Sequence, residues 1–359
     1  MKKICFIFCG DLYLCPYLKY YLNTLSINYD IICWNRDSNE NYDQNNIFAF
    51  HKEVISNNKL KKLYGYILFR KYCKDILKKN KYVGVVVLNT ITSLIIGNYL
   101  KKKFKKKYII DIRDYSGEFN KLIYKKEIPI FKNSYINFIS SSGYLSFLPK
   151  NMNYQMLHNI QNLDKTEATK IADQFLKKEK VGIGFIGSVD AYLTQHIKLI
   201  HNLKNNNKYQ LYFIGKGSEK LEKIIKDENI NNVTLKGKFN PADILKYYYD
   251  IDLINNLYGN NTPVLDYALS NKLYFSAILK VPILVCENTE MEKISKKYGF
   301  GISINLDKDN VEEVLDNYLE KLDIEKMKKG CERFLNEALH DNKNSTQILL
   351  EFERMCLNE

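Results

Sequence analysis

Short apolar runs alternate with amphipathic stretches along the whole chain, and this alternation limits the folds available to it more than any other feature. Runs of strand length that are separated by helical patterns form mostly parallel sheets covered by helices. The runs that we expect to be strands are residues 4–9, 30–34, 47–50, 83–88, 108–112, 136–140 and 154–158, and then 182–186, 210–214, 233–235, 251–255, 282–286 and 301–304. The sequence therefore predicts an α/β protein.

The apolar pattern weakens between residues 159 and 180, where polar residues accumulate before a new strand begins at Val181. A chain of 359 residues also exceeds the size at which a single core stops growing. We therefore predict two Rossmann-like, doubly wound domains that face a cleft. Their expected ranges are residues 1–160 and 181–340, with a linker at 161–180 and a last helix at 341–359 that packs back on the first domain.

Several sequence features bear on the cellular compartment. The first apolar run ends at Gly10-Asp11 without the small-residue cleavage site of a signal peptide, so we expect a cytoplasmic protein. No apolar run approaches the roughly 20 residues that a membrane-spanning helix needs. The eight cysteines are scattered, without the close pairs typical of zinc and redox sites, and we expect them to be reduced.

The net charge of +13 comes mainly from lysine, because arginine occurs at only five positions. Proteins that read nucleic acid favour arginine for bidentate contacts, so the composition argues against a nucleic-acid partner. A basic surface suits an anionic membrane face or an anionic lipid-linked substrate. Residues 59–79 predict a lysine-rich helix whose apolar stripe consists of Leu60, Leu63, Tyr64, Ile67, Leu68, Ile76 and Leu77. Core packing is the simpler interpretation of this stripe, and contact with the inner face of the cell membrane is the alternative.

Ligands of parallel sheets bind beyond the carboxyl ends of the strands, where glycine lets a backbone approach and helix N-termini favour anions. In the second half, Gly187-Ser188 follows the strand at 182–186, and a Gly215-Lys216-Gly217 turn follows the strand at 210–214. The second turn offers backbone amides and a cation together, which predicts an anion site. A turn that needs glycine only for steric reasons is the alternative.

Further motifs follow in a characteristic order. Gly237-Lys238-Phe239 comes after a short strand, a loop runs from Tyr258 through Asn260 and Asn261, Asn271-Lys272-Leu273 begins a helix, and Val281-Pro282 leads into another strand. This succession resembles the donor-binding domain of GT-B glycosyltransferases, particularly the family 4-like bacterial enzymes that build capsule and O-antigen polysaccharides. The resemblance covers nearly the whole second half of the chain.

The resemblance implies a nucleotide diphosphate sugar as donor, with a UDP-sugar favoured and no metal required. Lys272 would contact the diphosphate, since a lysine at a helix start offsets the charge of the leaving group. The loop at Asn260 would face the donor sugar. The donor-binding residues that it implies are Gly187, Ser188, Gly215, Lys216, Gly217, Gly237, Phe239, Tyr258, Asn260, Asn261, Lys272 and Leu273.

One departure from the family pattern concerns a pair of glutamates that many retaining members carry. The two positions are occupied here by Tyr267 and Phe275, and the neighbouring Asp266 does not restore the pair. The stereochemical outcome of transfer therefore stays open. The departure also admits a second interpretation, in which the chain is a non-catalytic partner subunit of another glycosyltransferase.

The first half would hold the acceptor, and its candidate residues again follow strands. The acceptor-binding set is Gly10, Asp11, Arg36 and Arg113, and Asp37 lies in the same segment as Arg36. Asp114 begins the loop after the strand at 108–112, where a carboxylate would orient or deprotonate an acceptor hydroxyl. An Asp111–Arg113 pair that only stabilises this loop is the alternative.

His158 ends the last strand of the first half, and it is a third catalytic candidate beside Asp114 and Lys272, although packing is the more common role for such a histidine. The chain contains no Walker-type loop, no nucleophile elbow and no dinucleotide fingerprint. The resemblance to GT-B glycosyltransferases therefore implies a metal-independent, hexosyltransferase-like enzyme that moves a sugar to a hydroxyl of a lipid-linked glycan. A sugar-nucleotide epimerase of similar architecture is a further alternative.

Overall fold

The computed structural model describes residues 2–36, 42, 44–52 and 59–358. Two compact units make up the chain. The first unit contains residues 1–158 and 340–359, and the second unit contains residues 159–339. Among the described residues, no helix is both long and apolar enough to cross a membrane.

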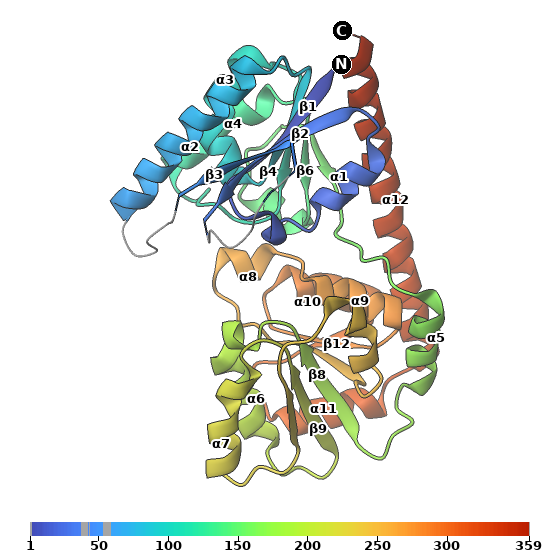
Figure 1. The fold of residues 1–359 in the computed structure, drawn as a ribbon. Coiled ribbons are helices and arrows are strands. Elements are labelled where there is room, and N and C mark those ends of the chain that lie inside the picture. The colour runs from blue at the N-terminus through green and yellow to red at the C-terminus, as the bar shows by residue number, and fades with distance from the viewer. Residues whose placement is uncertain (1, 37–41, 43, 53–58, 359) are drawn as a thin grey trace. The chain divides into compact units, whose positions relative to one another are not determined.

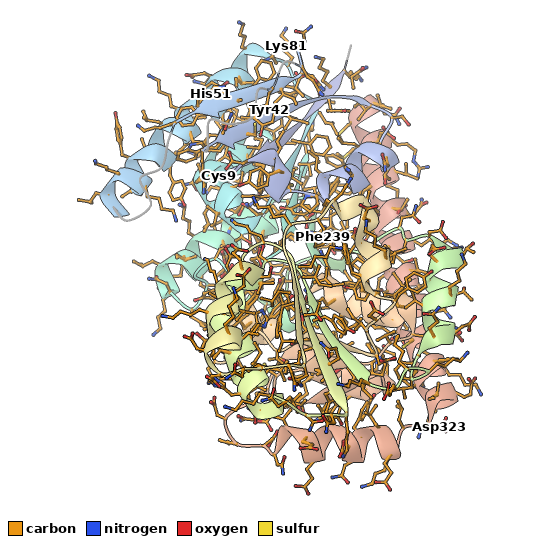
Figure 2. All side chains as sticks on the ribbon, turned by 60° about the horizontal axis from the view of Figure 1, so that its bottom comes forward. Cys9, Tyr42, His51, Lys81, Phe239 and Asp323 are labelled. Carbon is orange, nitrogen blue, oxygen red and sulfur yellow. The ribbon has the colours of Figure 1, made fainter. Side chains whose placement is uncertain are left out.

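The first unit is built on a seven-stranded sheet in which all neighbouring strands are parallel. The strands are β1 (Lys3–Phe8), β2 (Asn28–Asn35), β3 (Ile47–His51), β4 (Gly84–Leu88), β5 (Tyr108–Ile112), β6 (Ile136–Ile139) and β7 (Tyr154–Met156). Their order in the sheet is β3-β2-β1-β4-β5-β6-β7. Cys9 follows β1 at the carboxyl edge of this sheet and Lys81 precedes β4 at the amino edge, and both are labelled in Figure 2.

Helices cover both faces of this sheet (Figure 1). They are η1 (Leu12–Leu14), α1 (Leu18–Thr24), α2 (Lys59–Lys79), α3 (Thr90–Lys103), α4 (Lys121–Lys132), η2 (Ser142–Ser146) and the end of α12 (Ile324–Asn358). Helices α2, α3 and α4 lie side by side on one face, and α1 and α12 lie on the other. Because both faces are covered, the central strands are mostly buried and apolar, as in the GVVVL run of β4.

The second unit repeats this plan with six parallel strands. They are β8 (Val181–Ile186), β9 (Tyr209–Ile214), β10 (Val233–Lys236), β11 (Leu253–Asn256), β12 (Ile283–Val285) and β13 (Gly301–Ser303), in the order β10-β9-β8-β11-β12-β13. Connections run outward in both directions from β8, because β9 and β11 are its two neighbours. The carboxyl ends of β8 and β11 therefore flank a topological switch point, where ligands bind in sheets of this kind.

The helices of the second unit form two layers. They are α5 (Lys165–Gln174), η3 (Val189–Tyr192), α6 (Leu193–Leu203), η4 (Ser218–Leu221), α7 (Glu222–Asp227), η5 (Pro241–Tyr247), α8 (Pro263–Tyr267), α9 (Asn271–Leu279), α10 (Glu290–Tyr298), α11 (Val311–Glu320) and the start of α12. Apolar side chains of α6 and α11 pack in one core cluster. Those of α5, α9, α10 and α12 pack in the other.

Two segments differ from expectation. The stretch 161–180, expected to be a linker, contains α5, whose Ala168 and Ile171 are buried in the core of the second unit. The last helix begins at Ile324 rather than near residue 341. Its final turns lie against the first unit, where a Cβ on Gly84 would stand 2.7 Å from the Sγ atom of Cys356. Polar runs hide both segments from a sequence pattern, because an amphipathic helix needs only one apolar stripe.

Candidate functional site

A cavity of about 360 Å³ opens at the switch point of the second unit, next to the carboxyl ends of β8 and β11. This volume lies within the usual range of small-molecule sites, about 300–1,000 Å³. Four predicted donor residues meet in its wall, namely Gly187, Ser188, Tyr258 and Lys272. The remaining lining residues are Phe185, Ile186, Ala191, Tyr192, Ile244, Tyr248, Ser270, Asn271 and Phe275.

Lys272 is the charged residue of this wall, and it is only 7% exposed. The hydroxyl of Ser270 caps α9 by accepting a hydrogen bond from the Lys272 amide at 3.2 Å. The Lys272 Nζ atom donates to the Tyr258 hydroxyl at 2.8 Å and lies 4.2 Å from the ring centre of Phe185. Within the described residues, no carboxylate forms an ion pair with this ammonium group. A buried cation without a countercharge is costly, so the site favours an anionic ligand.

Two pairs of stacked aromatic rings form part of the wall. The rings of Tyr192 and Tyr258 stack with their centres 3.9 Å apart and their planes 5° apart. The rings of Tyr248 and Phe275 stack with their centres 5.3 Å apart and their planes 15° apart. Flat aromatic faces of this kind bind other flat rings, including nucleobases. Sequence reasoning missed Tyr192 and Tyr248 as lining residues, because no motif distinguishes them from ordinary packing tyrosines.

His196 lies behind this wall and is fully buried. Its ring centre is 4.3 Å from that of Phe185 and 4.9 Å from that of Phe213. Neither ring nitrogen has a hydrogen-bond partner among the described residues. Burial, and then the charge of Lys272, lower the pKa of His196 to about 3. The imidazole is therefore neutral at neutral pH and adds no positive charge beside Lys272.

Steric crowding explains the glycines of the turn after β9, and backbone hydrogen bonds join this turn to the neighbouring strands. The Gly187 amide donates to the Ile214 carbonyl at 2.9 Å, and the Gly215 amide donates to the Lys236 carbonyl at 2.8 Å. The Gly215 amide is therefore already used between strands, and the anion site at this turn stays a prediction. Gly215 has a φ of +132°, and a Cβ there would lie 1.9 Å from the Gly187 oxygen.

The rest of that turn is also structural. Gly217 adopts a left-handed conformation with a φ of +86° before η4, and a Cβ there would lie 2.4 Å from the Cβ of Asp190. Lys216 is exposed, and its carbonyl accepts from the Val189 amide at 2.8 Å. None of these three residues of the turn lines the cavity.

The other predicted donor residues lie outside the cavity wall. Leu273 is fully buried in the core of the second unit, because it faces away from the cavity on α9. Phe239, labelled in Figure 2, packs on Tyr247 with ring centres 5.1 Å apart. Gly237 is exposed and no atom approaches its missing Cβ within 4 Å. Asn260 and Asn261 line a separate hollow of about 320 Å³ in the second unit.

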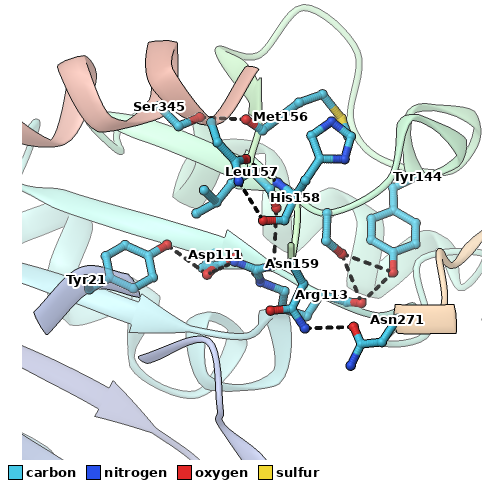
Figure 3. A network of polar contacts seen from close by, with 12 residues as sticks. Tyr21, Asp111, Arg113, Tyr144, Met156, Leu157, His158, Asn159, Asn271 and Ser345 are labelled. Carbon is cyan, nitrogen blue, oxygen red and sulfur yellow. Dashed lines mark hydrogen bonds and ion pairs between the residues drawn. The ribbon is translucent and has the colours of Figure 1, made fainter. Parts of the chain in front are cut away.

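In the first unit, Asp111 and Arg113 form a buried ion pair at the end of β5 (Figure 3). The Arg113 Nε atom lies 2.7 Å from Asp111 Oδ1, and Nη2 donates to Asp111 Oδ2 at 2.8 Å. The Tyr21 hydroxyl donates to the same Oδ2 at 2.7 Å, and Arg113 Nη1 donates to the Leu157 carbonyl at 3.2 Å. These contacts favour the loop-stabilising interpretation of Arg113. Asp114, the next residue, is exposed.

The other acceptor candidates also make internal contacts. Asp11 is 3% exposed, and its Oδ1 atom accepts from the Arg36 amide at 2.7 Å. The Arg36 guanidinium donates to the Cys9 carbonyl at 2.7 Å and lies 4.9 Å from the Trp34 ring centre. These contacts tie the segments after β1 and β2 together. A Cβ on Gly10 would lie 2.9 Å from the Phe8 ring, and Asp37 falls outside the described residues.

His158 connects the end of β7 to α12. Its Nε2 atom lies 3.1 Å from Asp341 Oδ2, its amide donates to Asn342 Oδ1 at 2.7 Å, and its carbonyl accepts from Asn342 Nδ2 at 3.0 Å. Burial lowers the pKa of His158. These contacts favour the packing interpretation over a catalytic one.

Two parallel sheets in separate units, each covered by helices on both faces, define the architecture of GT-B proteins, and comparison with solved structures agrees. HepE from Anabaena, solved with UDP, matches with a TM-score of 0.69 and 11% identity, over 98% of this chain and 100% of that one. Sucrose-phosphate synthase from Thermosynechococcus elongatus matches with a TM-score of 0.65 and 13% identity, over 100% of this chain and 97% of that one. WaaG, a glycosyltransferase involved in lipopolysaccharide biosynthesis, matches with a TM-score of 0.63 and 11% identity, over 97% of this chain and 99% of that one.

These matches confirm the predicted fold class, and the chain is similar to glycosyltransferases of GT-B architecture along its whole length. No protein-family model and no curated protein matches it in sequence. At 11–13% identity the likeness establishes the fold alone.

Proposed function

We propose that this chain is a glycosyltransferase that binds a nucleotide diphosphate sugar, with a UDP-sugar favoured, in the cavity of the second unit. The observation that carries the proposal is the buried Lys272 ammonium group, which faces that cavity without a carboxylate partner among the described residues. A diphosphate supplies the missing negative charge. HepE has the same fold and was solved in complex with UDP, which supports the choice of ligand.

The roles of the lining residues follow from their chemistry. Lys272 stabilises the diphosphate as it departs, which removes the need for a metal ion in the proposed mechanism. The Tyr258 hydroxyl holds Lys272 Nζ in position, and the stacked rings of Tyr192 and Tyr258 offer a flat apolar wall. Asp114 is the carboxylate that we propose as the acceptor base, since it is exposed at the end of a strand.

The proposed acceptor is a hydroxyl of a lipid-linked glycan in the synthesis of a cell-surface polysaccharide, of the capsule or O-antigen type. WaaG, which takes part in lipopolysaccharide biosynthesis, supports this choice through its fold. The proposed setting is the inner face of a bacterial cell membrane, with the protein peripheral to it.

The test compares Lys272→Met with Lys216→Met, because both remove one lysine charge but only Lys272 lines the cavity. We expect Lys272→Met to weaken UDP binding in calorimetry about 10- to 100-fold, the range for losing a hydrogen bond to a charged group. Lys216→Met should bind UDP like the parent chain. Equal binding by both variants, or no binding of any nucleoside diphosphate to the parent chain, would contradict the proposal.

A second candidate function is that of a non-catalytic partner subunit. The observation that favours it is Phe275, which stacks on Tyr248 at a position where the resembling enzymes carry a glutamate. Mass spectrometry of reactions with a panel of nucleotide sugars and glycan acceptors separates the two functions. A transferase yields a sugar-extended acceptor, whereas a partner subunit leaves donor and acceptor unchanged in the absence of its catalytic subunit.

A further inference from the structure

Helix α2 exposes an apolar stripe that core packing does not explain. Leu63, Tyr64 and Ile67 are 56–57% exposed, and Leu60 is exposed as well. These positions are three or four residues apart, so they share one side of the helix. The Tyr64 ring also contacts the Lys52 ammonium group at 4.5 Å. Large apolar side chains gathered on an exposed helix indicate a surface that binds something.

The same helix buries a different face in the first unit. Phe69 and Cys73 are fully buried, and a Cβ on Gly65 would lie 2.5 Å from the Trp34 ring. Phe69 stacks on Trp34 with ring centres 5.4 Å apart. Core packing therefore explains Leu77, which is 4% exposed, but it does not explain Leu60, Leu63, Tyr64 and Ile67, because α2 contacts the core through its opposite side.

Basic residues surround the stripe. Lys71, Lys74 and Lys78 lie 4, 7 and 11 residues after Ile67, so they continue the same side of α2. Lys and Arg occur eight times in α2, three times in α3 and four times in α4. Asp75 and Glu127 are the acidic residues of the three helices, and Glu127 is fully buried. Because these helices lie side by side on one face of the sheet (Figure 1), the layer that they form is strongly positive.

An exposed apolar stripe next to a lysine-rich surface is the pattern of helices that lie in the interface of anionic membranes. We propose that α2, together with the basic layer that it forms with α3 and α4, docks this chain on an anionic lipid bilayer. Leu63, Tyr64 and Ile67 enter the headgroup region, and the lysines contact lipid phosphates. A nucleic acid would use the lysines but not the stripe. This inference rests on the membrane setting of the proposed function and deepens it, but it involves none of the cavity residues.

Vesicle co-sedimentation tests this surface with phosphatidylcholine alone and with an equimolar mixture of phosphatidylcholine and phosphatidylglycerol. We expect the chain to bind the anionic vesicles at least tenfold more strongly than the neutral ones. Leu63→Ser with Ile67→Ser should lower that affinity at least tenfold. The control is Leu339→Ser, which removes an equally exposed leucine of the second unit and should bind like the parent chain.

Charge reversal tests the basic part of the surface. Lys71→Glu with Lys78→Glu should weaken binding to anionic vesicles more than tenfold, because each lysine near such a surface contributes about fivefold. Fluorescence of Trp34, on which Phe69 of α2 stacks, shows whether the variants are folded. UDP calorimetry on the same variants separates this proposal from the proposed function, because a loss of vesicle binding should leave UDP binding unchanged. Vesicle binding that the stripe variant leaves unchanged, equal binding to both vesicle types, or binding to RNA as strong as to anionic vesicles would overturn the proposal.

Discussion

Glu127 makes the first unit sensitive to pH in a way that the structure lets us quantify. This residue of α4 is fully buried, and neither carboxyl oxygen has a hydrogen-bond partner within the described residues. Burial, and then the charge of Glu118, raise the pKa of Glu127 from 4.5 to about 9. The folded chain therefore keeps this side chain protonated at neutral pH, whereas the unfolded chain ionises it.

The sign of the effect follows from proton binding in the two states. Between pH 4.5 and 9 the folded state holds one proton more at Glu127 than the unfolded state, so the free energy of unfolding falls as pH rises. The slope is about 1.4 kcal/mol per pH unit. Between pH 5.5 and 7.5 the contribution of Glu127 to stability therefore decreases by about 3 kcal/mol. Glu127→Gln has the same shape and does not titrate.

Trp34 provides the assay, because it is the single tryptophan of the chain and lies buried in the first unit together with Glu127. Urea unfolding followed by tryptophan fluorescence should show Glu127→Gln gaining about 3 kcal/mol on the parent chain between pH 5.5 and 7.5. The exposed Glu351→Gln on α12 serves as control and should show no such gain. A stability difference between Glu127→Gln and the parent chain that stays constant across this range would refute the reasoning.

Two further predictions concern the second unit. Burial lowers the pKa of His196 to about 3, so only the unfolded chain gains a proton as the pH falls below 6.5. The free energy of unfolding therefore decreases by about 2 kcal/mol by pH 5. His196→Phe should therefore retain hydrogen-exchange protection of α6 at pH 5 better than the parent chain, and an equal loss in both would count against the argument. Gly215→Ala should lower stability by about 3 kcal/mol or more in thermal unfolding, because its Cβ meets the Gly187 oxygen at 1.9 Å. Gly237→Ala, with open space around it, should unfold near the parent temperature, and similar unfolding of both variants would show the crowding argument to be wrong.

The sequence by itself determined the strands and the fold class. Each predicted strand overlaps an observed one. The central strands give the clearest signal, because a strand buried on both faces is a nearly unbroken apolar run such as residues 84–88. The residues that follow the predicted strands also include part of the cavity wall, since the carboxyl ends of parallel strands meet at one edge of the sheet. Gly187, Tyr258 and Lys272 were found in this way or through the family resemblance.

Only the tertiary structure decided which partners these residues have. The hydrogen bond from the Gly215 amide to the Lys236 carbonyl forms only when two strands pair, and these residues are 21 positions apart in the sequence. The stacking of Tyr192 on Tyr258 likewise requires two separate segments to meet. The two apolar sides of α2 illustrate the same limit. Periodicity shows that both sides are apolar, but the identity of the side that packs on Trp34 depends on the neighbouring sheet. Local patterns determine how a segment is shaped, whereas long-range packing determines what it contacts.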